Sequence, residues 1–345
     1  MNNCAIFCKP KTLRLLLTSF FLLSVLSPES GYAEKFFKTH STWYEKIPVN
    51  PEIMPNSPNY VNYIRGQMDG IAVAKGQWSV PIFYAVENTP KYDVEYTTSS
   101  QASQEAIASN GWNLNVPIPP EAKQAGVDAS TYRDGHLVTI SYDKKFAWDF
   151  YNANVSTNSK SAKVIKRWDL SGDGIDQPYT YAGARVSPIP LFHGLIIYQE
   201  IQDGYIDHAL AFSTWSAKRG SPGVYPCVTS NNGESDDPWA PWLGFRFQLD
   251  PNVDINSLGL NRAGRVIAKA MQEYGMIFIE NAGPGNNGVY AEDLDNKPES
   301  WDGIIGSLSG IPMDKLRVVE PIIPSSGESA DSSPPAPPQN LEFVH

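Results

Sequence analysis

Short runs of aromatic and β-branched residues, each ended by turn-forming residues, constrain the fold of this chain more than any other feature. Such runs favour β-strands, because branched and aromatic side chains pack well on a pleated surface. Asp143-Lys144-Lys145 and Gln202-Asp203-Gly204 are typical of hairpin turns between them. The predicted strands cover residues 136–142, 146–151, 194–201, 205–212, 244–249 and 276–280. The pattern predicts a mostly β protein.

One segment has helical periodicity instead. Between Ser257 and Tyr274 apolar residues recur at helical spacing, and Gly275 supplies a C-terminal stop. A repeat of the length of a propeller blade is not visible, and a barrel fits the pattern less well than two packed sheets. We therefore predict a β-sandwich of the jelly-roll kind with one amphipathic helix near residues 257–274.

The first 33 residues have the parts of a secretory signal peptide. A basic stretch at 9–14 precedes an apolar run, Leu15–Leu26, and Gly31-Tyr32-Ala33 offers a cleavage site between small residues. The apolar run is shorter than the roughly 20 residues that a membrane span needs. We predict cleavage after Ala33 and a secreted or periplasmic protein, with an uncleaved membrane anchor as the alternative.

The remaining sequence divides into three parts. Residues 34–58, with scattered prolines, predict an N-terminal arm, and residues 59–323 predict a single β-rich domain. The Pro- and Ser-rich tail, 324–345, lacks the apolar content to pack and is expected to be disordered. Cleavage would leave Cys227 as the one cysteine, so the fold must rest on its core rather than on a disulfide.

Charge and motifs exclude several classes of function. The formal net charge of −10 gives a surface that repels nucleic acid and anionic lipid, so we exclude both as main partners. The motifs of serine hydrolases, zincins, kinases and dehydrogenases are absent. We expect no required cofactor and no membrane contact after signal cleavage. The oligomeric state does not follow from these features.

The predicted hairpin around Asp203-Gly204 carries the main catalytic candidates. In its register Glu200 opposes Asp207, and Tyr198 and Tyr205 share their face. Opposed like charges destabilise a hairpin unless a cation, a shared proton or a ligand compensates. Two carboxylates about 5 Å apart suit a retaining glycosidase, and tyrosines would stack on sugar rings. A solvated face whose carboxylates meet lysine or arginine is the alternative.

Histidines and further carboxylates extend the set. His208 falls on the apolar face in this register as a core residue, whereas a slip of one residue would bring it to the polar face as an acid/base group. Asp134, His136 and Asp149 would meet on one sheet face near Trp148 as an acid/base or metal cluster. An ordinary turn and an aromatic strand explain the same residues without a site.

The segment from Asp169 to Asp176 resembles the start of a calcium loop. Asp169 and Asp173 take the first and fifth positions, a glycine follows, and Asp176 adds a third carboxylate. Thr180 stands where such loops carry a bidentate glutamate, so a plain polar turn is the alternative. If a metal binds here, we expect structural Ca²⁺.

Several segments together resemble a group of secreted, largely uncharacterised bacterial proteins. They are Asp134-Gly-His136, Trp148-Asp-Phe-Tyr151, Ile189-Pro-Leu191 with Gly194-Leu-Ile196, Ile206-Asp-His-Ala-Leu210, Gly244-Phe-Arg-Phe-Gln-Leu-Asp250 and Ala270-Met-Gln-Glu-Tyr-Gly-Met-Ile277. The resemblance covers about residues 110 to 300 and implies a single exported domain. It carries no activity and no catalytic residue, and it draws attention to Asp134, His136, Asp207 and His208.

These features favour an exported carbohydrate-active protein, either a glycoside hydrolase or a polysaccharide lyase, whose partner is an extracellular polysaccharide. Glu200 and Asp207 are the predicted acid/base pair, with His136 or His208 assisting and Arg185 orienting the substrate. A non-catalytic carbohydrate-binding domain would use the two tyrosines and exposed tryptophans alone. A cell-surface structural protein, interacting through its tail, is the third hypothesis.

Overall fold

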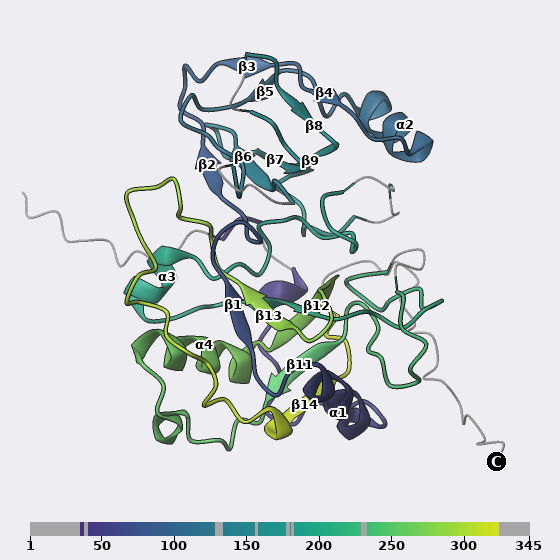
Figure 1. Cartoon of the computed structure of the whole chain (residues 1–345), viewed down its shortest axis with the longest axis vertical. Coiled ribbons are helices and arrows are strands. Elements are labelled where there is room, and N and C mark those ends of the chain that lie inside the picture. Colours follow the sequence, from purple (N-terminus) through teal and green to yellow (C-terminus); the bar gives the residue numbers. More distant parts are fainter. Residues whose placement is uncertain are drawn as a thin grey trace, which may run out of the picture. The chain divides into compact units, whose positions relative to one another are not determined.

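The computed structural model describes most of the chain after the predicted signal peptide (Figure 1). The predicted signal peptide and the predicted disordered tail lie outside the described residues. The helices of the described part include none that is long and apolar enough to cross a membrane. The described residues all fall in one compact unit. The described residues are 35–37, 41–127, 134–155, 158–176, 180, 183–228 and 233–323.

Strands predominate over helices. The strands are β1 (Ala72–Ala74), β2 (Ile82–Tyr84), β3 (Lys91–Tyr92), β4 (Glu95–Tyr96), β5 (Val116–Pro117), β6 (Leu137–Ile140), β7 (Phe146–Tyr151), β8 (Ser161–Ala162), β9 (Val164–Asp169), β10 (Leu210–Thr214), β11 (Arg246–Leu249), β12 (Met276–Asn281), β13 (Asn287–Tyr290) and β14 (Leu316–Val319). The α-helices are α1 (Ser57–Gln67), α2 (Gln101–Asn110), α3 (Tyr198–Asp203) and α4 (Arg262–Glu273). Short 3₁₀ turns occupy Thr42–Tyr44, Ile255–Leu258 and Met313–Lys315.

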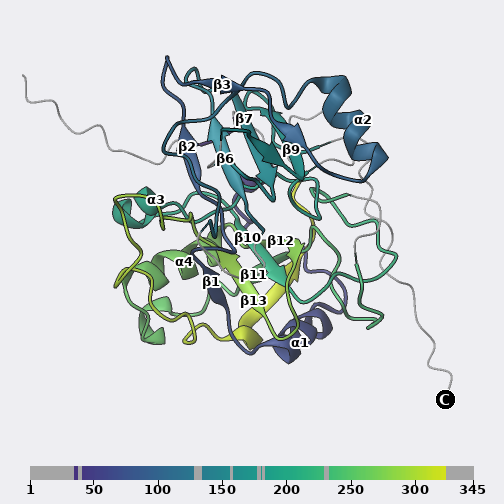
Figure 2. The same ribbon diagram turned by 45° about the horizontal axis from the view of Figure 1, so that its top comes forward.

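The largest sheet has six strands in the order β1-β13-β10-β12-β11-β14, and Figure 2 shows β10 among its neighbours. Its ladders are mixed: β1 pairs β13 and β10 pairs β12 in parallel, whereas the other neighbours are antiparallel. The second sheet has four strands in the order β2-β6-β7-β9. The predicted mostly β class is confirmed. The jelly-roll sandwich stays a prediction, and the parallel ladders differ from the antiparallel pairing of that architecture.

The predicted turn at residues 143–145 is confirmed by a hairpin of β6 and β7. Leu137 pairs with Phe150 and Ile140 with Ala147 in an antiparallel ladder. Ser141 Oγ accepts hydrogen bonds from the backbone N–H groups of Phe146 (3.0 Å) and Lys145 (3.2 Å). Local alternation and local turn chemistry are sufficient to specify this element.

The predicted helix is present as α4, but it begins later than expected. Asn261 caps it by accepting a hydrogen bond from Gly264 N (2.9 Å), whereas Ser257 and Leu258 belong to the preceding 3₁₀ turn. The apolar side of α4 packs against β11, which is a strand of the large sheet (Figure 1). The expectation of a single helix was wrong in number, because α1, α2 and α3 are also helical.

The predicted hairpin of residues 194–201 and 205–212 is wrong. Tyr198–Asp203 forms the short helix α3, and Gly204, with φ of 86°, ends it in the left-handed conformation. The Glu200 side chain caps the start of this helix by accepting from Ile197 N (2.9 Å). A single helical turn can bury the same apolar side chains as a strand, so alternation alone did not separate the two.

Two hydrophobic clusters form the core. The larger surrounds the six-stranded sheet and includes the fully buried Trp43 from the predicted arm. Trp43 O accepts a hydrogen bond from Ala209 N (2.8 Å), which ties that segment to the approach of β10. The smaller cluster packs around the second sheet and includes Trp112 and Trp148.

Candidate functional site

A cavity of about 910 Å³ is lined by residues of four neighbouring strands of the large sheet. These strands are β1, β13, β10 and β12, and the segments 134–136 and 183–186 line the cavity as well. Its walls combine apolar, amide, aromatic and ionisable side chains. A concave surface of this size and composition is typical of a small-ligand site.

Small residues in one row across the sheet leave room for the cavity. Ala72 pairs with Gly288, Gly288 with Ser213, and Ser213 with Glu280, and all of these residues line the cavity. Residues opposite each other in a ladder point to the same face. The β10–β12 ladder shifts by one residue after Phe212, so that Glu280 rather than Ile279 stands opposite Ser213. Ala72, Gly288 and Ser213 thus form a floor of small side chains in the cavity, and the Glu280 carboxyl stands at the end of this floor.

Glu280 is a partly buried carboxyl at the edge of this floor. Its Oε2 accepts from Val186 N (3.3 Å) and its Oε1 from Asn281 N (3.0 Å). Burial raises the pKa of Glu280 to about 7, because the low-dielectric surroundings disfavour its charged form more than Arg185 and these N–H groups favour it. Negative charge on Asp134 acts in the same direction as burial. Glu280 is therefore able to hold a proton near neutral pH.

Asp134 and His136, both predicted as site residues, line the same cavity. The His136 ring lies 6.0 Å from that of Tyr151, another lining residue. Burial, reinforced by Arg185, lowers the pKa of His136 to about 3, so its imidazole is neutral at physiological pH. This half of the site supplies a carboxylate and a neutral ring.

Arg185 lines the cavity from the segment 183–186, which lies between β9 and α3. Its substrate-orienting role stays a prediction. Its Nη2 donates to Leu191 O (2.9 Å), and its guanidinium carbon lies 4.8 Å from the centre of the Tyr290 ring. The cavity therefore holds a cation and two carboxyl groups. Groups of both signs in one cavity can bind a polar ligand and move a proton.

Trp78 gives the cavity an aromatic wall that is 45% exposed. Amide side chains are also present: Asn281 Oδ1 accepts from Ala217 N (2.9 Å), and Asn286 Nδ2 donates to Gly283 O (3.1 Å). An exposed indole beside amide and carboxyl groups suits a sugar ring, whose faces are apolar and whose edge carries hydroxyl groups.

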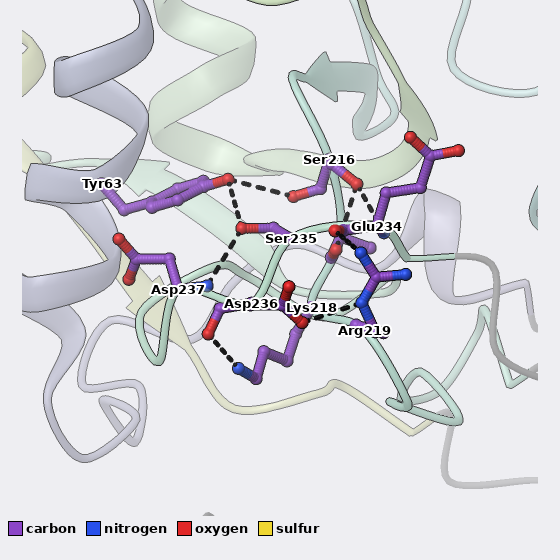
Figure 3. Close-up of polar contacts among 9 residues, drawn as sticks. Tyr63, Ser216, Lys218, Arg219, Glu234, Ser235, Asp236 and Asp237 are labelled. Atoms are coloured by element: carbon purple, nitrogen blue, oxygen red, sulfur yellow. Dashed lines mark hydrogen bonds and ion pairs between the residues drawn. The ribbon is translucent and has the colours of Figure 1, made fainter.

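A polar network fastens the chain after β10 to α1 (Figure 3). Tyr63 of α1 donates to Ser235 Oγ (3.1 Å), and its hydroxyl lies 3.5 Å from Ser216 O. Arg219 pairs with Asp236 (2.8 Å) in the same network. These bonds hold the end of β10, whose penultimate residue lines the cavity, at a fixed position.

The predicted pair of Glu200 and Asp207 lies outside this cavity, and the helix that replaces the hairpin separates their environments. Glu200 is 4% exposed and pairs with His208 Nε2 (2.9 Å). Asp207 pairs with Lys35 (3.3 Å). Burial lowers the pKa of His208, but the Glu200 carboxylate outweighs it and the net change is upward. Each carboxylate thus has its own cation.

The other predicted substrate-binding residues have partners elsewhere. Tyr205 donates to Glu273 Oε2 (2.9 Å), and Tyr198 packs near Trp301 with ring centres 5.4 Å apart. Trp148 is buried and donates to a backbone carbonyl. Asp149 is also buried and accepts from the Trp168 indole N–H (2.9 Å), and burial raises its pKa to about 6. None of these four side chains lines the cavity.

The predicted calcium ligands act separately. Asp169 accepts from Ser171 N (2.9 Å), and Asp173 from Ile175 N (3.0 Å). Asp176 forms an ion pair with Lys166. Within the described ranges, three or more histidine, cysteine, aspartate or glutamate side chains do not gather as a metal site would need. Calcium binding stays a prediction without support from this arrangement.

Glu280 is not among the site residues predicted from the sequence, although a signal was present: a carboxyl follows the buried run Met276–Ile279 and precedes Asn281. The small residues of the floor gave no local signal, because strands distant in sequence bring them together. Comparison with protein-family models, with curated proteins and with solved structures gave no match to this chain.

Proposed function

We propose that the cavity is the active site of an exported enzyme that cleaves a polysaccharide, with Glu280 as proton donor and Asp134 as the second carboxylate. The observation that carries this proposal is the placement of two carboxyl groups in one cavity, one of which, Glu280, has its pKa raised by burial. Burial raises the pKa of Glu280 to about 7, so a substantial fraction of this carboxyl keeps its proton at neutral pH. Two carboxyl groups whose environments favour different charge states can divide acid and base roles.

Hydrolysis of a glycosidic bond would use these groups in the following roles. Glu280 would give its proton to the leaving oxygen as the bond to the anomeric carbon breaks. The negative charge of Asp134 would stabilise the positive charge that develops on the sugar ring. One water molecule is consumed: its hydroxyl ends on the anomeric carbon and its proton restores the acid. Trp78 would hold the sugar by stacking on one face.

The test is product formation by the full chain on a panel of neutral and acidic polysaccharides, followed as new reducing ends and as absorbance of unsaturated ends. Glu280→Gln and Asp134→Asn should each lower turnover by about 100- to 10,000-fold, because each removes proton transfer or charge stabilisation. Glu320→Gln is the matched control, since burial also raises the pKa of Glu320 and this residue does not line the cavity.

Three outcomes separate the hypotheses. Products that vanish in both cavity variants but persist in the control support the enzyme and its site. Absorbance without new hydrolytic ends would replace hydrolysis by elimination at the same site. Binding of a polysaccharide without any product would instead favour the carbohydrate-binding domain.

A further inference from the structure

Two buried arginines in this protein have very different surroundings. Arg246, 2% exposed, donates to Thr42 O (2.7 Å), Thr42 Oγ1 (2.9 Å) and Glu45 O (3.3 Å). Arg185 is 6% exposed and donates to Leu191 O. Among the described residues, the buried Nε–H of Arg185 has no hydrogen-bond partner, and its guanidinium forms no ion pair with a carboxylate. Arg246 shows how this fold satisfies a structural guanidinium, and Arg185 is not satisfied in that way.

An incompletely partnered guanidinium is costly away from bulk water, because its charge loses hydration without gaining equivalent hydrogen bonds. Arg185 bears this cost at the wall of a cavity large enough for a sugar. The planar fork of a guanidinium matches a carboxylate, which can accept two parallel hydrogen bonds. The position therefore favours a ligand that brings its own carboxylate.

We propose that Arg185 binds the carboxylate of an acidic sugar, so that the ligand of the cavity is a polysaccharide of uronic acid residues. This inference rests on the proposed function of the cavity and adds the class of sugar to it. Sugars carry carboxylates as uronic acids, and Trp78 would stack on the ring of the same residue whose carboxylate meets Arg185.

A carboxylate bound at Arg185 would also act on Glu280. Arg185 favours the ionised form of Glu280, in opposition to burial. A bound carboxylate would neutralise that positive charge and so keep Glu280 protonated. When an acidic sugar enters the cavity, it would therefore help to keep the Glu280 carboxyl protonated, whereas a neutral sugar would not.

The experiment is calorimetric titration of the full wild-type chain with tetramers of galacturonate, glucuronate and mannuronate. The same tetramers with methyl-esterified carboxylates, and tetramers of the matching neutral hexoses, provide the controls. Esterification removes the charge and keeps the sugar ring. We expect one acidic tetramer to bind at least about 10-fold more tightly than its ester, as loss of a charge-assisted hydrogen bond implies.

Two substitutions locate the effect. Arg185→Met should weaken binding of the acidic tetramer by about 10- to 100-fold and leave binding of the ester unchanged, while Arg185→Lys should fall between. Arg317→Met, which removes an arginine of β14 that donates to Gln248 and does not line the cavity, should change neither affinity. The comparison of acid with ester within one variant distinguishes loss of this contact from general misfolding.

The results separate the inference from the proposed function. Equal affinity for acid and ester, tighter binding of neutral tetramers, or no binding of any acidic tetramer would overturn the role of Arg185. Cleavage of neutral polysaccharides would still support the proposed function in those cases. Preferential binding of an acidic tetramer without cleavage would support the inference and count against catalysis.

Discussion

Glu200 and Glu280 are both withdrawn from solvent, yet the protein treats them differently. Glu200 is 4% exposed, accepts from Ile197 N and pairs with His208, so its charge has a partner. Glu280 accepts backbone hydrogen bonds but has no ion pair among the described residues, and it lines a cavity. The Glu200 carboxylate has a structural role, in which it caps a helix and pairs with a histidine. The Glu280 carboxyl remains able to exchange a proton with a ligand in the cavity.

This contrast shows why a raised pKa alone does not mark a site. Burial also raises the pKa of Asp149 to about 6, yet Asp149 is enclosed by Trp168 and the backbone of Leu191. A perturbed carboxyl becomes a candidate when a ligand can reach it. Access and charge together separate Glu280 from the other buried acids.

The largest expected effect is on turnover. Glu280→Gln should lower kcat by about 100- to 10,000-fold, whereas Glu200→Gln should leave kcat within about 3-fold of wild type under conditions where both variants are folded. Initial rates on the active polysaccharide measure this difference. If Glu200→Gln were as inactive as Glu280→Gln, Glu200 would not be purely structural, and the site predicted from the sequence would again be a candidate.

The next effect is on stability against pH. The native pKa of Glu280, about 7, exceeds its ordinary value of 4.5, so the native state holds a proton that the unfolded state has lost between these pH values. Unfolding free energy should therefore fall as pH rises through this window. Glu280→Gln should remove about 2 kcal/mol of that fall. Denaturant unfolding at pH 4.5 and pH 8 measures it, and an unchanged pH dependence would contradict it.

Glu200→Gln should act on stability instead of turnover. His208 has a raised pKa, so the pair stabilises the protein fully below the ordinary histidine pKa of 6.5, and this contribution is lost as pH rises through the raised value. The substitution should cost about 1–3 kcal/mol at pH 5 and less at pH 9. A cost independent of pH would mean that the ion pair contributes little.

The smallest effect concerns the cavity wall. Trp78→Ala should weaken ligand binding by about 3- to 10-fold, because stacking of an aromatic ring contributes about 0.5–1.5 kcal/mol. Tyr142→Ala is a control, since Tyr142 is an exposed aromatic residue that does not line the cavity. Equal weakening by both substitutions would show that Trp78 makes no specific contact.

The sequence predicted elements whose signals are local. The hairpin of β6 and β7 has clear alternation around a polar turn, and α4 has helical spacing with a glycine after its end. The prediction failed around Glu200, because an apolar pattern of this length fits either a strand or one helical turn. The pair Asp203-Gly204 predicts a hairpin turn, although the same glycine can end a helix, as it does here.

Three residues of the candidate site could be named from the sequence. Asp134, His136 and Arg185 stood out by residue type and all line the cavity. Glu280 and Gly288 did not, because their role depends on the order of strands in the large sheet. A single sequence carries little information about which distant strands become neighbours, and here that order creates the floor.

The shift in the β10–β12 ladder has a consequence for comparing related chains. Because strand side chains alternate, a change of one residue in length normally turns everything beyond it to the opposite face. The ladder accommodates Ile279 as an extra residue, so Glu280 keeps its place opposite Ser213. A homologue that lacks this residue can therefore present the same carboxyl at the same place. An alignment with such a homologue should keep the glutamate at the Glu280 position, where it pairs with Ser213, and put the gap at Ile279.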